Sequence, residues 1–300
     1  MPEGDETKKP AKIKSQLFQN PWQTFSIEAF LFCLTLLLGI VTASRINEVL
    51  KFQKVIIPQF SFWQFIFYFL LTTLLIFFVP YFVRFKKEKK AFFKAVFVLA
   101  TFFGGISFFN CWMSGLPALI LMAGIVFWWL KQPTILNQDL CLILGMAGIG
   151  SILGLSLNPL MVALLLVFFS IYDFIAVYKT KHMIRMAKEM IESRAILALV
   201  VPQNISGFRE SLEKIEPGGK FLILGGGDVV FPLLFAASLV SQGILSSLIV
   251  AIFSLIGLFA GFWFFISQPP TRTGGGRQPI PALPPIALFS IIGFFITLII

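Results

Sequence analysis

The chain has 300 residues, of which 57% are hydrophobic and only 13% are charged, and its net charge is +10. A water-soluble domain cannot bury that share of apolar surface, so the composition excludes an ordinary soluble enzyme. The apolar runs are long and do not alternate with polar residues, and they therefore predict an all-α polytopic membrane protein.

Residues 1–24 are largely polar and are predicted to form a tail outside the bilayer. Nine apolar runs follow, which we expect to cross the roughly 30 Å of hydrocarbon as nine transmembrane helices. The predicted spans are Phe25–Ala43, Phe62–Val83, Ala95–Met113, Leu116–Leu130, Leu140–Leu157, Pro159–Tyr178, Phe221–Val240, Gly243–Ser267 and Pro281–Ile300. The third and fourth are separate because one helix over both would be ~54 Å long.

The domain organisation follows from these spans. The first six occupy residues 25–178, a basic loop covers residues 179–220, and the last three occupy residues 221–300. The three parts are expected to form one membrane-embedded domain.

The loop charges predict the orientation of the chain. With nine spans, 21 of the 24 lysines and arginines fall on the side of the amino terminus and three on the other side. If the third and fourth spans were one helix, 10 of these basic residues would fall on the side of the amino terminus and 14 on the other side. Because cytoplasmic loops carry the excess of basic residues, the amino terminus is predicted in the cytoplasm and the carboxyl terminus outside. These cations at the membrane surface explain the net charge without a nucleic-acid partner.

Two aspartates lie inside apolar runs, Asp173 in the sixth predicted span and Asp228 in the seventh. A carboxylate in hydrocarbon costs several kcal/mol, so each marks a functional site. The two spans are antiparallel, and helical geometry predicts both acids at nearly the same depth below the cytoplasmic face. A coupled carboxylate pair suits acid/base hydrolysis of peptide bonds. It equally suits a cation or proton channel or a secondary transporter, and the residues alone leave both functions open.

The neighbours of the acids predict irregular backbone around a cavity. Gly225, Gly226 and Gly227 remove side-chain bulk before Asp228 and permit unusual backbone angles, although close helix packing is the simpler explanation of the glycines alone. Pro232 cannot donate an amide to the carbonyl of Asp228. The ninth span opens with Pro281, Ala282 and Leu283, a third irregular element on the same side of the membrane.

Other chemistries are disfavoured by the rest of the sequence. The single histidine, His182, cannot form an HExxH zinc site, and it falls in a basic loop where a Ser-His dyad within the membrane could not use it. The three cysteines lie within or at the edge of spans and are interpreted as small core residues. No Gly-Lys-Ser/Thr follows the glycines, so no phosphate loop is predicted. We expect neither a metal nor a cofactor.

Three short motifs, taken together, resemble those of a known family. Tyr172-Asp173, Gly225-Gly226-Gly227-Asp228 and Pro281-Ala282-Leu283 are similar to the YD, GxGD and PAL motifs of the presenilin and signal peptide peptidase family of intramembrane aspartyl proteases. They stand in the family's order, on the sixth, seventh and ninth of nine spans, so the resemblance covers the whole chain. Its small size and short loops resemble a microbial homologue, which would lie in the cell membrane.

The resemblance implies an intramembrane aspartyl endopeptidase with Asp173 and Asp228 as its catalytic dyad. Pro281, Ala282 and Leu283 would shape the site and hold an unwound substrate segment. Tyr172 would donate a hydrogen bond there, with a buried aromatic ring as the alternative. The substrates would be single transmembrane helices that enter from lipid, and the presenilin-like orientation implies that their amino termini lie outside. We expect no obligatory accessory subunit, and the sequence leaves the oligomeric state open.

Three further features are predicted to be peripheral. Glu28 lies near the start of the first span and is expected to reach the interface by snorkelling, and Asp139 is interpreted as a capping or interfacial residue. The loop at residues 179–220 is interpreted as a surface helix followed by an apolar linker on the headgroups, with a plug or self-cleavage segment as the alternative that the resemblance suggests.

Overall fold

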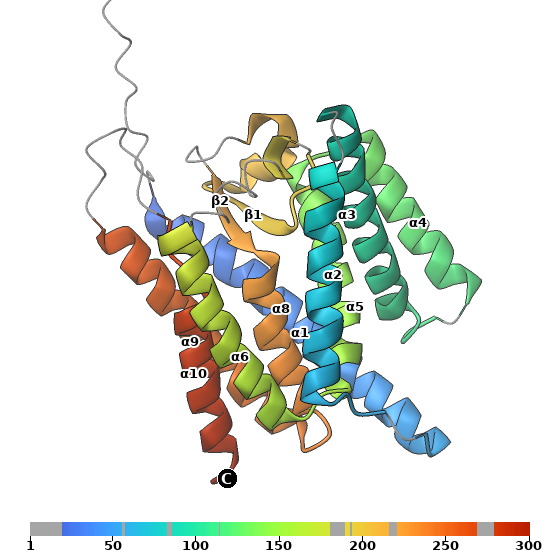
Figure 1. The fold of residues 1–300 in the computed structure, drawn as a ribbon. Helices are drawn as coiled ribbons and strands as arrows, with labels where there is room; N and C mark the ends of the chain where they lie inside the picture. Colours follow the sequence, from blue (N-terminus) through green and yellow to red (C-terminus); the bar gives the residue numbers. More distant parts are fainter. Residues whose placement is uncertain are drawn as a thin grey trace, which may run out of the picture.

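The fold was analysed in a computed structural model that describes residues 20–55, 58–82, 86–113, 115–180, 190–192, 194–215, 221–268 and 279–300. It is a bundle of helices with one small hairpin at one end (Figure 1). The α-helices are α1 (Pro21–Gln53), α2 (Phe62–Phe82), α3 (Lys86–Phe109), α4 (Leu116–Lys131), α5 (Ile135–Leu155), α6 (Pro159–Ile175), α8 (Gly226–Ser238), α9 (Ile244–Ser267) and α10 (Leu283–Thr297).

Each predicted span contains an apolar helix within the described residues. Five helices are long and apolar enough to cross a membrane by themselves, and four apolar helices are shorter. The expectation of a multi-pass helical membrane protein is therefore confirmed. That all nine helices cross the bilayer, and the division of the chain at residues 24, 178 and 220, stay predictions.

The seventh predicted span is not helical at its start. Phe221–Gly225 forms strand β2, which pairs antiparallel with β1 (Ala198–Pro202) from the preceding loop, with Val200 opposite Ile223. All five residues of β1 are buried, so this part of the loop is not the surface linker that we predicted. A short apolar run of five residues fits a buried strand as well as a helix, and the pairing partner decides between them.

Helices α1, α5 and α8 form the centre of the bundle. A hydrogen bond joins α5 to α1, because the hydroxyl of Ser151 donates to the carbonyl oxygen of Gly39 at 2.8 Å. In α8 every residue from Pro232 to Ser238 is buried. Gly154 of α5 lies so close to α8 that an added Cβ would be 2.8 Å from the carbonyl oxygen of Leu234. Small residues allow such contact, which gives membrane helices much of their packing energy.

Helices α6 and α10 pack on this centre and carry two of the three motifs. Helix α10 lies against α9, and the two are joined by a hydrogen bond of 2.7 Å between the buried hydroxyls of Ser254 and Ser290. Helix α6 ends at Ile175 and continues as one π-helical turn over Ala176–Thr180. The hairpin lies at the opposite end of the bundle from the carboxyl terminus (Figure 1).

Candidate active site

The two aspartates face each other across the contact between α6 and α8. Phe169 lies one turn before Asp173, and Phe231 lies one turn after Asp228. The rings of these phenylalanines stack, with centroids 4.4 Å apart and an angle of 27° between the planes. Residues one turn apart share a helix face, so the stacked rings bring the two carboxyls to facing surfaces. The carboxyls lie close enough for the charge of Asp173 to act on Asp228.

Backbone amides hold both carboxyls. The N–H of Leu283, the first residue of α10, donates to the carboxyl of Asp173. The N–H of Gly225, the last residue of β2, donates to the carboxyl of Asp228. Asp173 is 6% exposed, and its Oδ2 atom is buried without a hydrogen-bond partner among the described residues. One carboxyl oxygen of Asp173 is therefore buried with its acceptor capacity unused.

Gly225 and Gly226 allow other atoms to lie close to the backbone before Asp228. The unusual backbone angles that we expected for the glycine run are not found. The positive φ angles among the described glycines belong to Gly115 and Gly243. A Cβ on Gly225 would lie 2.8 Å from Oδ2 of Asp228, and one on Gly226 would lie 2.8 Å from the carbonyl oxygen of Leu197. Gly227 is different, because its nearest neighbour, the ring of Phe231, would be 3.8 Å away.

The remaining motif residues are not all brought to the dyad. Pro281 and Leu283 are buried, and Ala282 packs against the core, so the start of α10 lines the site beside Asp173. Tyr172 is 49% exposed, which places its ring on the outer face of α6. A role for Tyr172 in the site stays a prediction.

Glu28 is a third acid at the site, and we did not predict it there. It is 4% exposed, its Oε2 atom has no hydrogen-bond partner among the described residues, and the charge of Asp228 acts on it. The expected snorkelling is therefore wrong. Depth along α1 does not show which way a side chain faces, and helix packing turns Glu28 inward. The sequence does contain a signal for this orientation. Leu31 and Phe32 follow Glu28 by three and four residues, so all three residues lie on one face of α1.

A cavity of about 250 Å³ adjoins the glycine run. It lies between α3, α5 and the first turn of α8, and its walls are apolar apart from Thr101. The residues from α8 are Gly226, Gly227 and Val230. A space of this kind beside the glycine run can hold an apolar side chain of a bound molecule.

The sequence matches a known family, and the fold is similar to that of solved structures. A family model described as "Signal-peptide peptidase, presenilin aspartyl protease" matches residues 27–300. A solved structure titled as a presenilin family intramembrane aspartate protease in space group C222 has a TM-score of 0.59 and 20% identity, covering 92% of this chain and 97% of that chain. A second, in space group P2, has a TM-score of 0.53 and 23% identity, covering 89% and 96%. No curated protein matches the sequence.

Proposed function

The chain belongs to the signal-peptide peptidase and presenilin family of intramembrane aspartyl proteases, and on this premise we propose that Asp173 and Asp228 are its catalytic dyad. The observation that carries the proposal is the stacking of Phe169 on Phe231, which supports facing positions for the two acids. The hydrogen bonds from Leu283 and Gly225 support a site whose two carboxyls are held by rigid backbone.

Two like charges in a low-dielectric site cannot both form cheaply, so the dyad holds one proton between its carboxyls. The ionised carboxylate takes a proton from water as the water oxygen attacks the scissile carbonyl carbon. The protonated carboxyl donates its proton to the carbonyl oxygen, and a tetrahedral diol results. As the diol collapses, one of its hydroxyls gives its proton to the ionised carboxylate, the carbonyl re-forms and the C–N bond breaks. The leaving nitrogen takes the proton of the other carboxyl, so the dyad again holds one proton.

The substrate is a transmembrane helix that is locally unwound at the bond to be cut. A helical peptide bond is already hydrogen-bonded, so it must leave the helix before water attacks it. The sheet has two strands within the described residues, and β2 leads directly to Asp228. An extended substrate segment is able to pair along β2 and thereby reach the dyad.

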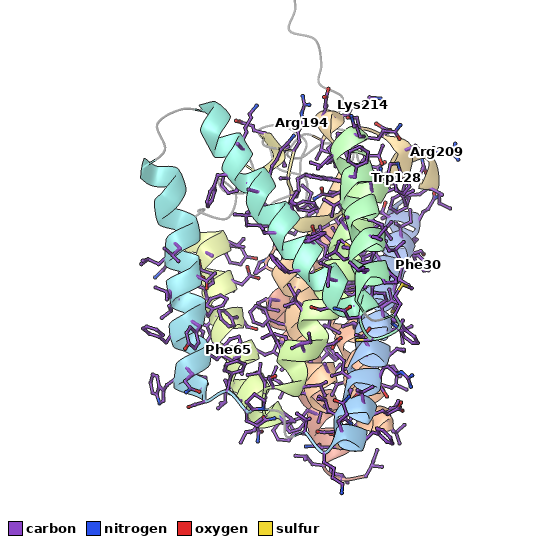
Figure 2. The ribbon with its side chains drawn as sticks, turned by 90° about the vertical axis from the view of Figure 1, so that its right-hand side faces the viewer. Phe30, Phe65, Trp128, Arg194, Arg209 and Lys214 are labelled. Atoms are coloured by element: carbon purple, nitrogen blue, oxygen red, sulfur yellow. The ribbon has the colours of Figure 1, made fainter. Side chains whose placement is uncertain are left out.

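We expect the end of the molecule that carries the hairpin to face the cytoplasm. The side chains of Arg194, Arg209 and Lys214 gather at this end (Figure 2). Their position agrees with the excess of basic residues in the loops assigned to the cytoplasm. Substrates with an external amino terminus would then be cut near the cytoplasmic leaflet.

This orientation predicts a labelling pattern for single cysteines in a background with Cys33, Cys111 and Cys141 replaced by alanine. A membrane-impermeant maleimide should label Gln242→Cys, in the exposed turn between α8 and α9, in intact cells. It should label Arg209→Cys, an exposed loop residue, only in inverted vesicles or permeabilised cells. The reverse pattern would show that the carboxyl terminus is cytoplasmic.

The proposed function is tested with the purified protein alone, in liposomes, with a single-span helical substrate. We expect two products whose masses place the cut within the hydrophobic segment, without added subunits. A helical substrate that stays intact, together with cation flux through the same liposomes, would favour the channel that the paired acids also suit.

A further inference from the structure

The first turns of α5 contain buried polar side chains, and two of them contact the hairpin. Gln138 is 0% exposed and Asp139 is 1% exposed. The helix is capped by Thr134, whose hydroxyl accepts from the N–H of Asn137 at 3.4 Å, so Asp139 is neither the cap nor an interfacial residue as predicted. Most buried polar side chains are hydrogen-bonded, and in Asp139 the Oδ1 atom has a partner whereas Oδ2 has none among the described residues.

Both side chains bind the backbone of the hairpin. Oδ1 of Asp139 accepts from the N–H of Val200 at 2.9 Å, in the middle of β1. Nε2 of Gln138 donates to the carbonyl oxygen of Ile196, just before β1. Gln138 is itself oriented from α4, because Nε1 of Trp129 donates to its Oε1 at 2.9 Å. Strand β1 is therefore attached to α5 at two points four residues apart.

Strand β1 in turn positions the catalytic turn. Its ladder with β2 ends at Ala198 opposite Gly225, and the N–H of Gly226 continues it by donating to the carbonyl of Leu197 at 3.1 Å. Asp228 follows two residues later, and its carboxyl accepts from the N–H of Gly225. A shift of β1 on α5 is thus passed through backbone hydrogen bonds to the carboxyl of Asp228.

We infer that Asp139 and Gln138 are positioning residues that hold Asp228 in register with Asp173 through β1. The inference rests on the proposed dyad. Val200 is 0% exposed, and its N–H bonds Asp139 on the edge of β1 away from β2. Without this acceptor the N–H would be buried and unpaired, and the strand would move to satisfy it. A misplacement of about 1 Å at a reacting group costs on the order of 10²-fold in rate.

The test compares Asp139→Ala with Asn137→Ala in the full-length protein. Asn137 is a matched control, because it lies in the same turn at 2% exposure and its Nδ2 donates at 2.8 Å to the carbonyl of Gln132, which is not in the hairpin. We expect Asp139→Ala to lower kcat about 10- to 100-fold with little change in KM. Asp139→Asn keeps an acceptor for Val200 and should restore most of the rate, and Asn137→Ala should keep kcat.

Hydrogen exchange gives a readout that needs no activity. The amide of Val200 should exchange about tenfold faster in Asp139→Ala and at an unchanged rate in Asn137→Ala, because only Asp139→Ala removes the acceptor of this amide. If the Val200 amide exchanges at the same rate in Asp139→Ala as in the wild type, the inference is overturned even when no substrate is cleaved. If the amide exchanges faster in Asp139→Ala but the wild-type protein cleaves no substrate, the result counts against the proposed function alone. Equal loss of kcat in both alanine variants would also overturn it. If Asp139→Ala does not fold, Gln138→Met removes the second attachment and is measured in the same way.

Discussion

Replacing either Asp173 or Asp228 with asparagine should abolish measurable cleavage, with a loss of about 10³- to 10⁴-fold in kcat. Asparagine keeps the shape of aspartate and can still accept the bonds from Leu283 and Gly225, but it can neither take a proton from water nor donate one from a carboxyl group. The measurement is single-turnover cleavage of a labelled single-span substrate by purified protein in liposomes.

The double variant should be no slower than either single variant. Two carboxyls that share one proton act as a unit, so removing the second removes nothing further. Glu48→Gln is the control, because this acid lies in the exposed part of α1 that carries the ion pair with Arg45 at 3.5 Å. A single variant that keeps a tenth of the wild-type rate would show that the replaced aspartate is not catalytic. A double variant whose loss is the product of the two single losses would show that the aspartates act independently.

The helices and the two aspartates were predictable because their signals are local. A long apolar run predicts a transmembrane span whatever helices pack beside it. An acid within such a run indicates a functional site, because burying a carboxylate in hydrocarbon costs free energy. The approach of Leu283 to Asp173 was anticipated only in outline, through the resemblance of the motifs. Its physical form, an amide at the start of α10 that donates to a carboxyl on α6, depends on the packing of two distant helices.

The hairpin and the buried acids were not predictable for the same reason. Strand β1 and strand β2 are apolar runs of five residues whose partner lies in another part of the chain, and periodicity alone cannot identify it. Glu28 and Asp139 lie near the ends of predicted spans, where an acid is usually solvated. Glu28 is buried close to Asp228 of α8, and Asp139 is buried against β1, where it accepts from the N–H of Val200.

Gly257→Ala should lower kcat by about 10²-fold and the stability by about 1–3 kcal/mol, because it opens the contact between α9 and α10. An added Cβ would lie 2.6 Å from Cα of Ile286 and 2.6 Å from the carbonyl oxygen of Pro285. Both atoms belong to the backbone, so no side chain can rotate away. Helix α10 must move by roughly 1 Å to restore van der Waals contact.

That displacement reaches the dyad because Leu283 lies only two residues before Pro285 on α10, and its N–H holds Asp173. Gly124→Ala on α4 is the matched control, since its added Cβ would meet nothing within 4 Å and alanine favours a helix. Thermal unfolding and single-turnover cleavage in the same liposomes check both effects. If Gly257→Ala cleaves as fast as Gly124→Ala, the start of α10 does not position Asp173, and the PAL segment contributes to substrate binding alone.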